Sequence, residues 1–412
     1  MSGKRIVKNT LFLYVLTFSN YFIGLLLFPV LSRTLSVEMF GLVGFAMAYA
    51  LLFQVIVDFG FMISATADIA KNRRSIRTMS RIISDVMYAK VALSVVAVGL
   101  CVASAALLPM VRDNLPILLL FLASSALSAL LPDFYYRGIE AMKIIAIRTL
   151  AIKLCAIAII VTLVHGDQDV LFVPLGMIIG NGIAVIVTAV AMRRDGIVRV
   201  SFHLKRVLQT LRGSSLFFVS RLAVSVNQAA GSFFLSMQFT PLSREIGVFS
   251  GASRLAGAGE MALSPVVDGL YPHMVHKKDY RMFWRVLVVG VVIWAVICGV
   301  IAVFAEQLCV MVLGVDFAES GVHLRTMMVG VFLALPNMMM GYNALSPLGA
   351  AKHANLSIVI SAGINIGLFV TLYGMSLLTP ATAAMVIAGS NGSMLIYRSV
   401  IFYRHYRSMR VL

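Results

Sequence analysis

Residues 286–306 read VLVVGVVIWAVICGVIAVFAE, an apolar run that reaches Glu306 before it meets a charged side chain. About 20 such residues, coiled as an α-helix, cross the hydrocarbon core of a bilayer. Similar runs recur along the chain, in which apolar residues make up 60% of 412 residues and charged residues 12%. This composition excludes a water-soluble fold. We predict an all-α membrane protein with twelve transmembrane helices, at residues 9–31, 39–66, 85–110, 115–133, 144–164, 169–192, 214–236, 245–272, 286–306, 322–345, 355–374 and 381–402.

Basic residues gather in every second gap between the predicted helices. Of the 34 Lys and Arg residues, 26 lie in gaps on the side of the N-terminus, the last group being Arg398 to Arg410, and only Arg33, Arg112, Arg244 and Arg325 lie in the opposite gaps. Because cytoplasmic loops carry the excess of Lys and Arg, we predict that both termini are cytoplasmic. This topology accounts for the net charge of +17, so membrane lipids are expected partners and nucleic acid is not.

The longest cytoplasmic gap separates six predicted helices from six. We therefore predict an N-terminal half at 1–200, a cytoplasmic amphipathic linker at 201–213 and a C-terminal half at 214–412. Apolar residues in the linker follow the i, i+3, i+4, i+7 spacing of one helix face, from Leu204 to Leu211. This pattern fits a helix lying on the membrane surface beside anionic lipid, and it also fits an ordinary solvated linker helix.

Two short matches indicate an internal duplication. Leu35–Gly41 resembles Leu242–Gly247 at an offset of about 206, and Leu131-Pro132-Asp133 resembles Leu335-Pro336-Asn337 at an offset of 204. Each half holds an even number of predicted helices, so the two halves share one orientation in the membrane. The sequence therefore predicts two parallel-related six-helix bundles around a central cleft, which is an arrangement typical of transporters.

Several basic residues fall deep inside the predicted helices, where a charge is costly unless it meets water, a partner or a ligand. Lys153, Arg221 and Arg254 are the deepest, and we predict that they bind an anionic substrate. Lys90 and Arg148 lie nearer the helix ends, where long side chains can reach the interface, and are weaker candidates for the same role. The alternative for each is a structural ion pair.

Three acidic residues lie within the predicted helices and are candidates for ion coupling: Asp58, Glu260 and Asp268. A carboxylate in a partly dry cleft can exchange a proton or bind sodium, which makes Asp58 or Glu260 a candidate coupling site. Pairing with Arg or Lys is the alternative. Arg254 is six residues from Glu260 and fourteen from Asp268, so neither meets it on its own helix. We expect another helix or an anionic ligand to satisfy Arg254.

No motif predicts catalysis. The chain has no glycine-rich phosphate loop followed by Lys and no HExxH, and the predicted loops are too short to hold a soluble enzyme. Its four cysteines show no metal-ligand spacing. We therefore expect a protein that is not an enzyme and needs neither cofactor nor metal. Pro132, Pro265 and Pro336 lie in or at the end of predicted helices, where proline bends or ends a helix.

One segment holds a distinctive set of residues: Pro132, Tyr136, Gly138-Ile139-Glu140 and Met142-Lys143. These residues are similar to the Pro, aromatic, Gly-Ile-Glu-x-Met-Lys segment of the Wzx-type polysaccharide flippases, which the chain resembles. Arg137 stands where Gln is expected. Further similarities are Leu31 to Glu38, Phe40-Gly41, Asp58-Phe59-Gly60, Asp68-Ile69-Ala70, Ser346-Pro347-Leu348-Gly349 and Lys352.

The resemblance implies the multidrug/oligosaccharidyl-lipid/polysaccharide exporter fold. It also implies transfer of an undecaprenyl-diphosphate-linked oligosaccharide from the inner to the outer leaflet of a bacterial inner membrane, with a polysaccharide polymerase and chain-length proteins as expected partners. Asn20 and the absence of a carboxylate in the first predicted helix give no match to the cation site of some drug-exporting relatives. Two other functions stay open: a drug or cation antiporter of the same fold, and a membrane-embedded glycosyltransferase or polymerase.

Overall fold

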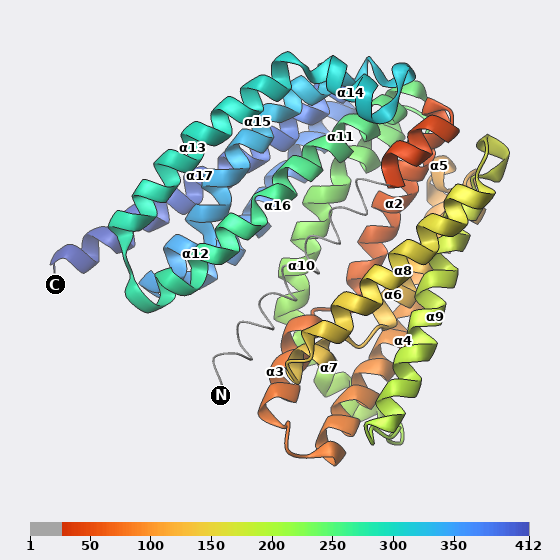
Figure 1. The fold of residues 1–412 in the computed structure, drawn as a ribbon, viewed down its shortest axis with the longest axis vertical. Helices are drawn as coiled ribbons and strands as arrows, with labels where there is room; N and C mark the ends of the chain where they lie inside the picture. The colour runs from red at the N-terminus through yellow and green to blue at the C-terminus, as the bar shows by residue number, and fades with distance from the viewer. Residues whose placement is uncertain (1–26, 412) are drawn as a thin grey trace. The chain divides into compact units, whose positions relative to one another are not determined.

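The computed structural model describes the backbone of residues 27–411 and the side chains of residues 27–407. Within this range the chain forms helices and no β-strand (Figure 1). The α-helices are α2 (Val37–Asp58), α3 (Phe61–Lys71), α4 (Ile76–Leu107), α5 (Pro109–Arg112), α6 (Leu115–Leu130), α7 (Asp133–Gly138), α8 (Met142–Leu163), α9 (Phe172–Arg194), α10 (Leu204–Gln238), α11 (Arg244–Ala262), α12 (Ser264–Lys277), α13 (Tyr280–Val303), α14 (Ala305–Leu313), α15 (Ser320–Met338), α16 (Ala351–Gly374) and α17 (Pro380–Val411). A π-helical segment, η3 (Met339–Asn343), follows α15, and 3-10 turns lie at Asp167–Asp169, Val315–Phe317 and Ser346–Leu348.

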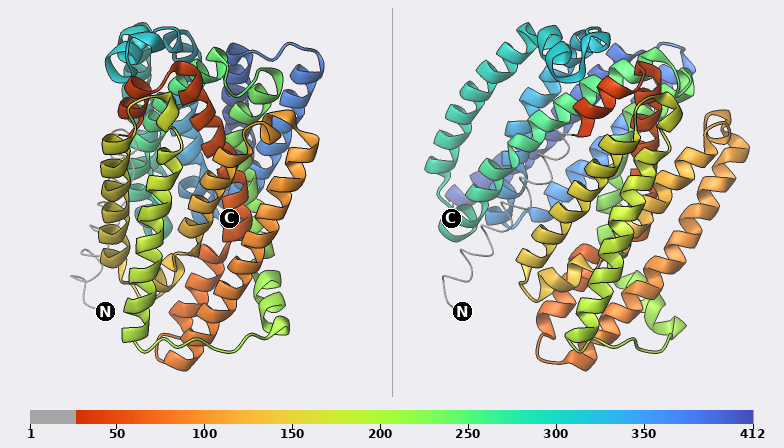
Figure 2. Two further views of the ribbon diagram at one scale, coloured as in Figure 1. Left: turned by 90° about the vertical axis from the view of Figure 1, so that its right-hand side faces the viewer. Right: turned by 45° about the vertical axis from the view of Figure 1, so that its right-hand side comes forward.

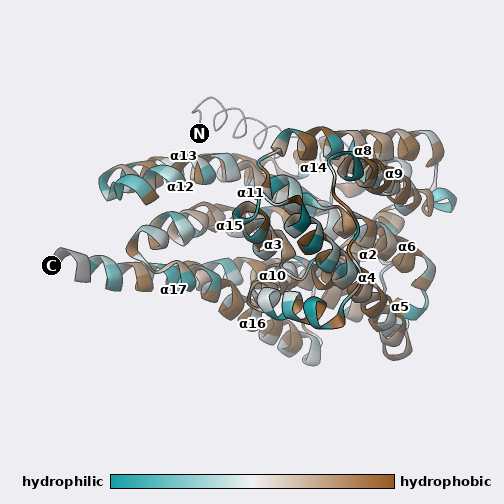
Figure 3. Ribbon diagram, turned by 90° about the horizontal axis from the view of Figure 1, so that it is seen from below, coloured by the Kyte–Doolittle hydropathy of each residue, from teal (hydrophilic) through white to brown (hydrophobic). Residues whose placement is uncertain are grey.

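The helices bear out an all-α membrane protein. Among the described residues, nine helical segments have the length and apolar character needed to cross a membrane. The predicted helices at 214–236 and 245–272 coincide with α10 and with α11 and α12, which carry more polar residues. Most of the predicted helix at 9–31 lies outside the described residues. Exposed apolar side chains line α9 and α13, whose ribbons are largely brown in Figure 3, as a surface facing lipid requires.

The chain divides into two compact units, which are described separately. Unit 1 contains residues 46–225 with the segment that ends at Val30, and unit 2 contains residues 31–45 with the chain from Val226 onward. The limits of the units therefore fall inside α2 and α10. The two repeated halves at 1–200 and 214–412 stay a prediction, because a compact unit need not coincide with a duplicated segment.

The predicted linker at 201–213 stays a prediction, and the structure adds that its helical part is continuous with the helix that follows. Residues from Leu204 onward form the first turns of α10, which continues without interruption past Gly213 to Gln238. Val207 is buried in the core of unit 1 and Leu211 packs against that core, whereas Leu204 and Leu208 are exposed. Tertiary packing of Val207 and Leu211 therefore holds these turns against unit 1, and the helix continues through Gly213.

Unit 1 is built around two interrupted helices. The path from α2 to α3 turns sharply at Phe59 and Gly60, whose φ angles are 40° and 77°. A Cβ on Gly60 would lie 2.7 Å from the Cβ of Phe217, so this turn needs glycine for both its backbone conformation and its space. The second interruption separates α6 from α7 at Leu131 and Pro132, since proline cannot donate a helical hydrogen bond.

The other helices of unit 1 support these two. The short helices α3 and α7 pack against each other, and Phe61, Ile69 and Phe134 lie in their shared core. The helix α9 packs against α6 and α8, and α8 and α9 run side by side in yellow and yellow-green in Figure 2.

Unit 2 has corresponding interruptions. The helix α11 ends at Ala262 and α12 begins at Ser264, with Pro265 in its first turn. Near the end of α15, Pro336 precedes the π-helical η3, where Gly341 has the non-helical ψ angle of −117°. The helix α15 packs against α11, α13 and α17. The prolines predicted to bend or end helices therefore lie at helix breaks in both units.

Candidate functional site

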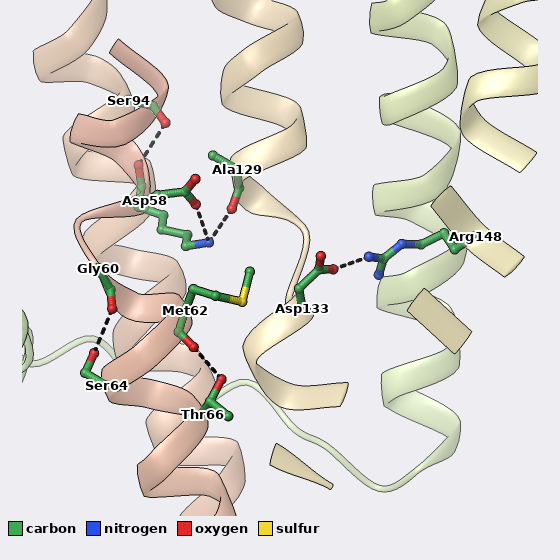
Figure 4. A network of polar contacts seen from close by, with 10 residues as sticks. Asp58, Gly60, Met62, Ser64, Thr66, Ser94, Ala129, Asp133 and Arg148 are labelled. Atoms are coloured by element: carbon green, nitrogen blue, oxygen red, sulfur yellow. Dashed lines mark hydrogen bonds and ion pairs between the residues drawn. The ribbon is translucent and has the colours of Figure 1, made fainter. Parts of the chain in front are cut away.

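A buried ammonium joins the two helix breaks of unit 1. Lys90, on α4, is 2% exposed, and its Nζ lies 3.4 Å from Oδ1 of Asp58, the last residue of α2. The same Nζ donates a hydrogen bond to the backbone carbonyl of Ala129, in the last turn of α6 (Figure 4). Both contacts lie at helix C-termini, where the helix dipole favours a cation. This geometry fits the alternative given for Lys90, a structural ion pair, because its charge is satisfied inside the protein.

A second ion pair lies next to this one. Arg148, on α8, donates to the carboxylate of Asp133, the first residue of α7 (Figure 4). The Arg148 side chain is only 8% exposed, and its guanidinium lies 6.0 Å from the centre of the Tyr136 ring. Arg148 is thus a buried ion-pair partner and does not reach out to the interface. Its Nε and Nη1 atoms, and the Tyr136 hydroxyl, have no hydrogen-bond partner among the described residues.

Arg221 completes this group of charges. It is exposed on α10, and its charge interacts with that of Asp58, as does the charge of Asp133. No side chain among residues 27–407 lies within ion-pair distance of Arg221. We call Asp58, Lys90, Asp133, Arg148 and Arg221 the unit 1 cluster. Its three cations and two carboxylates leave one positive charge in excess.

Lys153 lies outside the unit 1 cluster. It is partly buried on α8, five residues beyond Arg148. At about 100° per residue, this separation turns the two side chains about 140° apart around the helix axis. The five predicted substrate-binding residues therefore do not all lie in one place. Lys90, Arg148 and Arg221 lie together in unit 1. Lys153 lies apart from them in the same unit, and Arg254 belongs to unit 2.

The predicted residues of unit 2 lie on α11 and α12. Arg254 and Glu260 are both partly buried on α11. Oε1 of Glu260 accepts a hydrogen bond of 3.5 Å from Nδ2 of Asn391, on α17. Asp268, on α12, is exposed, which weakens it as a candidate for ion coupling. Glu260 is therefore a partly buried carboxylate of unit 2 that accepts a hydrogen bond from a neutral amide.

Arg398 is the residue whose role the sequence did not indicate. The count of basic residues in the sequence placed Arg398 with the cytoplasmic C-terminal residues. In the structure it lies in α17 and is only 6% exposed. Its guanidinium donates to Oγ of Ser357 at 2.8 Å, to the carbonyl and Oδ1 of Asn337 at 2.7 and 2.9 Å, and to the carbonyl of Ala354 at 3.2 Å. One feature of the sequence could have indicated this burial: Arg398 lies within the predicted helix at 381–402.

A chain of polar side chains links Arg398 to Glu260. Asn337, which binds Arg398, also donates through Nδ2 to Oδ1 of Asn391 at 3.5 Å, and Asn391 in turn donates to Glu260. Asn391 also donates to the carbonyl of Gly330 at 3.3 Å. Unit 2 thus holds a continuous network between a carboxylate on α11 and a cation on α17.

Among the described residues, no group of three His, Cys, Asp or Glu side chains is placed to hold a metal ion. The four cysteines are free. In α14, which lies between the predicted membrane helices, burial raises the pKa of the Cys309 thiol to about 11, so the thiol stays protonated and unreactive at neutral pH.

Comparisons with solved structures agree with the described fold. The chain matches a multidrug resistance MATE family transporter of the MOP superfamily with a TM-score of 0.72 at 14% identity, over 96% of this chain and 95% of that one. It matches the lipid II flippase MurJ with a TM-score of 0.66 at 14% identity, over 94% and 86% of the two chains. At these identities the likeness establishes the fold alone, which this chain shares with both proteins.

Sequence comparisons give the family. Two relatives carry the name "Putative O-antigen transporter": one from Escherichia coli, 27% identical over 65% of this chain and 64% of its own length, and one from Shigella dysenteriae, 26% identical over 78% and 81%. The chain thus spans less than two thirds of the Escherichia coli relative. A family model described as polysaccharide biosynthesis protein matches residues 6–278. The chain therefore belongs to the polysaccharide biosynthesis protein family, and its resemblance to the Wzx-type flippases is confirmed.

Proposed function

We propose that this multi-pass membrane protein is a flippase that moves an undecaprenyl-diphosphate-linked oligosaccharide from the cytoplasmic to the periplasmic leaflet of a bacterial inner membrane. Support comes from the family, from the names of the two relatives and from the fold shared with a lipid II flippase. In this proposal both termini are cytoplasmic and the two halves open alternately to either side.

The excess positive charge of the unit 1 cluster is the observation that carries the proposal. Arg221 is an exposed arginine within a predicted membrane helix. In each of the two ion pairs of the cluster, the cation and the carboxylate neutralise each other, so the excess charge is that of Arg221. A diphosphate offers the charge and the acceptor oxygens that a guanidinium binds best. A drug exporter for cationic substrates would instead require an excess of negative charge here.

Three basic residues are proposed to hold the headgroup: Arg221, Lys153 and Arg254. Lys90 and Arg148 drop out of direct binding, since Asp58 and Asp133 already pair with them. For ion coupling, Glu260 is preferred to Asp58, because a carboxylate paired with Lys90 is not available for a proton or sodium ion.

The function can be tested in inverted membrane vesicles that contain the lipid-linked precursor. Precursor that reaches the vesicle lumen becomes protected from an added glycosidase, and wild-type protein should produce this protection. Replacing Arg221, Lys153 and Arg254 together by Gln should abolish it, whereas Arg221→Lys, which keeps the charge, should retain part of it. Normal protection by the triple variant at normal protein level would remove the proposed role of these cations.

A further inference from the structure

We propose that Lys90 in unit 1 and Arg398 in unit 2 are positioning residues for transport, each holding a backbone carbonyl at a break in a membrane helix and so fixing the angle between the segments on either side. We call these two side chains the helix clamps. The proposal rests on the proposed function where it concerns transport, and on geometry alone where it concerns the breaks.

In unit 1 the segment beyond the breaks is one body. Thr66 of α3 donates through Oγ1 to the carbonyl of Phe134 in α7 at 3.3 Å. Gly138 lets the Ile69 side chain lie directly against the α7 backbone. Arg73 Nη1 and Glu140 Oε1, just beyond the two helices, form an ion pair of 2.6 Å. The helices α3 and α7 therefore have to move together.

Lys90 stands at the point where this body joins the rest of unit 1. The joined segments are α2, which ends at Asp58, and α6, in whose last turn the carbonyl of Ala129 lacks its helical donor because the N–H of Asp133 bonds to the carbonyl of Leu131 instead. One ammonium from α4 contacts both of these ends. Removing it would leave a carboxylate and a carbonyl without their donor at the two points about which α3 and α7 can turn.

Unit 2 has similar contacts at its helix breaks, made by different residues. Asn343 of η3 donates through Nδ2 to the carbonyl of Val267 in α12 at 2.8 Å, so these two segments are also joined. At the break before η3, Arg398 donates to the carbonyl and side chain of Asn337 and connects them to the first turns of α16. A Cβ on Gly341 would lie 3.1 Å from Nη1 of Arg398, which shows how closely the guanidinium lies against the distorted backbone.

Each clamp is also linked to a carboxylate. Asp58 contacts Lys90 directly, and Glu260 reaches Arg398 through Asn391 and Asn337. Neither clamp is placed to bind substrate, since Lys90 is 2% and Arg398 6% exposed. Both are therefore expected to act on the shape of the membrane helices.

Hydrogen exchange measured by mass spectrometry on the full chain in lipid nanodiscs tests the clamps. Lys90→Met keeps an apolar stem of similar length and removes the charge. It should speed amide exchange about tenfold or more in residues 61–71 and 133–138, and leave residues 264–277 and 339–343 unchanged. Arg398→Met should give the opposite pattern. Lys153→Met, which removes a lysine elsewhere in unit 1, should leave all four segments unchanged.

Conservative variants keep the test decisive if a methionine variant does not fold. Asp58→Asn removes only the charge that Lys90 faces and should give a smaller change in the same two segments of unit 1. Arg398→Lys retains a cation and should exchange more slowly than Arg398→Met in residues 339–343. Unchanged exchange at the breaks, or faster exchange spread evenly over both units, would overturn the proposal.

Transport separates positioning from binding. In the vesicle assay, Lys90→Met should lower the maximal rate about tenfold with the half-saturating precursor concentration unchanged, because fewer molecules hold the productive helix angle. Lys153→Gln should instead raise the half-saturating concentration. A shift in half-saturation for Lys90→Met would contradict a positioning role. If the wild-type protein moves no precursor at all, the proposed function fails, while the exchange experiment still decides whether the clamps exist.

Discussion

Replacing Asp133 by Asn should destabilise unit 1 strongly, because Arg148 would keep its charge and lose its counter-ion. The Arg148 side chain is 8% exposed and two of its nitrogens already have no partner among the described residues. Removing one partner of a buried ion pair costs about 3–5 kcal/mol. The Asp133 side chain is 23% exposed, so water screens part of this loss, and we expect a decrease of about 2–4 kcal/mol in the free energy of unfolding.

Asp113→Asn is the matched control. Asp113 pairs with Arg112 at 3.5 Å, but both side chains are about two-thirds exposed, so its loss should cost about 0–1 kcal/mol. Unfolding of each variant in mixed micelles with increasing sodium dodecyl sulfate gives the comparison. Adding Arg148→Met to Asp133→Asn should restore most of the stability, since the uncompensated charge is gone. Equal stabilities for Asp133→Asn and Asp113→Asn would show that burial adds nothing to the Asp133–Arg148 ion pair.

Three further changes test other parts of the structure. Gly60→Ala should cost about 1–3 kcal/mol of unfolding free energy, since φ is 77° and the new Cβ meets Phe217. Gly363→Ala, whose Cβ would meet no atom within 4 Å beyond its own stretch of helix, should be neutral or stabilising, and equal effects in denaturation would contradict this. Glu260→Gln should make precursor transport in vesicles insensitive to collapse of the coupling gradient, proton or sodium; a variant as sensitive as the wild type would exclude Glu260. Arg221→Gln should weaken precursor binding more than Arg221→Lys, and equal half-saturating concentrations would count against headgroup binding.

The fold was largely accessible from the sequence because the bilayer imposes a length on every apolar run. The predicted helix at 115–133 coincides with α6, and that at 144–164 with α8. The interruptions were only partly visible: Pro132 and Pro336 indicated two of them, but the turn at Gly60 depends on its contact with Phe217, more than 150 residues away. Such long-range packing leaves no periodic signal.

The candidate site was harder to predict. Depth along a helix selected Arg221 and Glu260 as candidates, but it could not decide between the interface and an ion pair for Lys90 and Arg148, because it takes no account of carboxylates on other helices. Arg398 was missed for the same reason, since counting basic residues assigns them to loops, and its acceptors on α15 and α16 are 41 to 61 residues away in the chain. Only tertiary structure brings a cation to a carbonyl at a helix break.

Deleting the gene and locating the lipid-linked glycan is the decisive experiment for the proposed flippase. We expect one glycan to disappear from the cell surface while its undecaprenyl-diphosphate-linked precursor accumulates in the cytoplasmic leaflet, and the wild-type gene to reverse both effects. Unchanged surface glycan, or its loss without precursor accumulation, would exclude the proposed translocation.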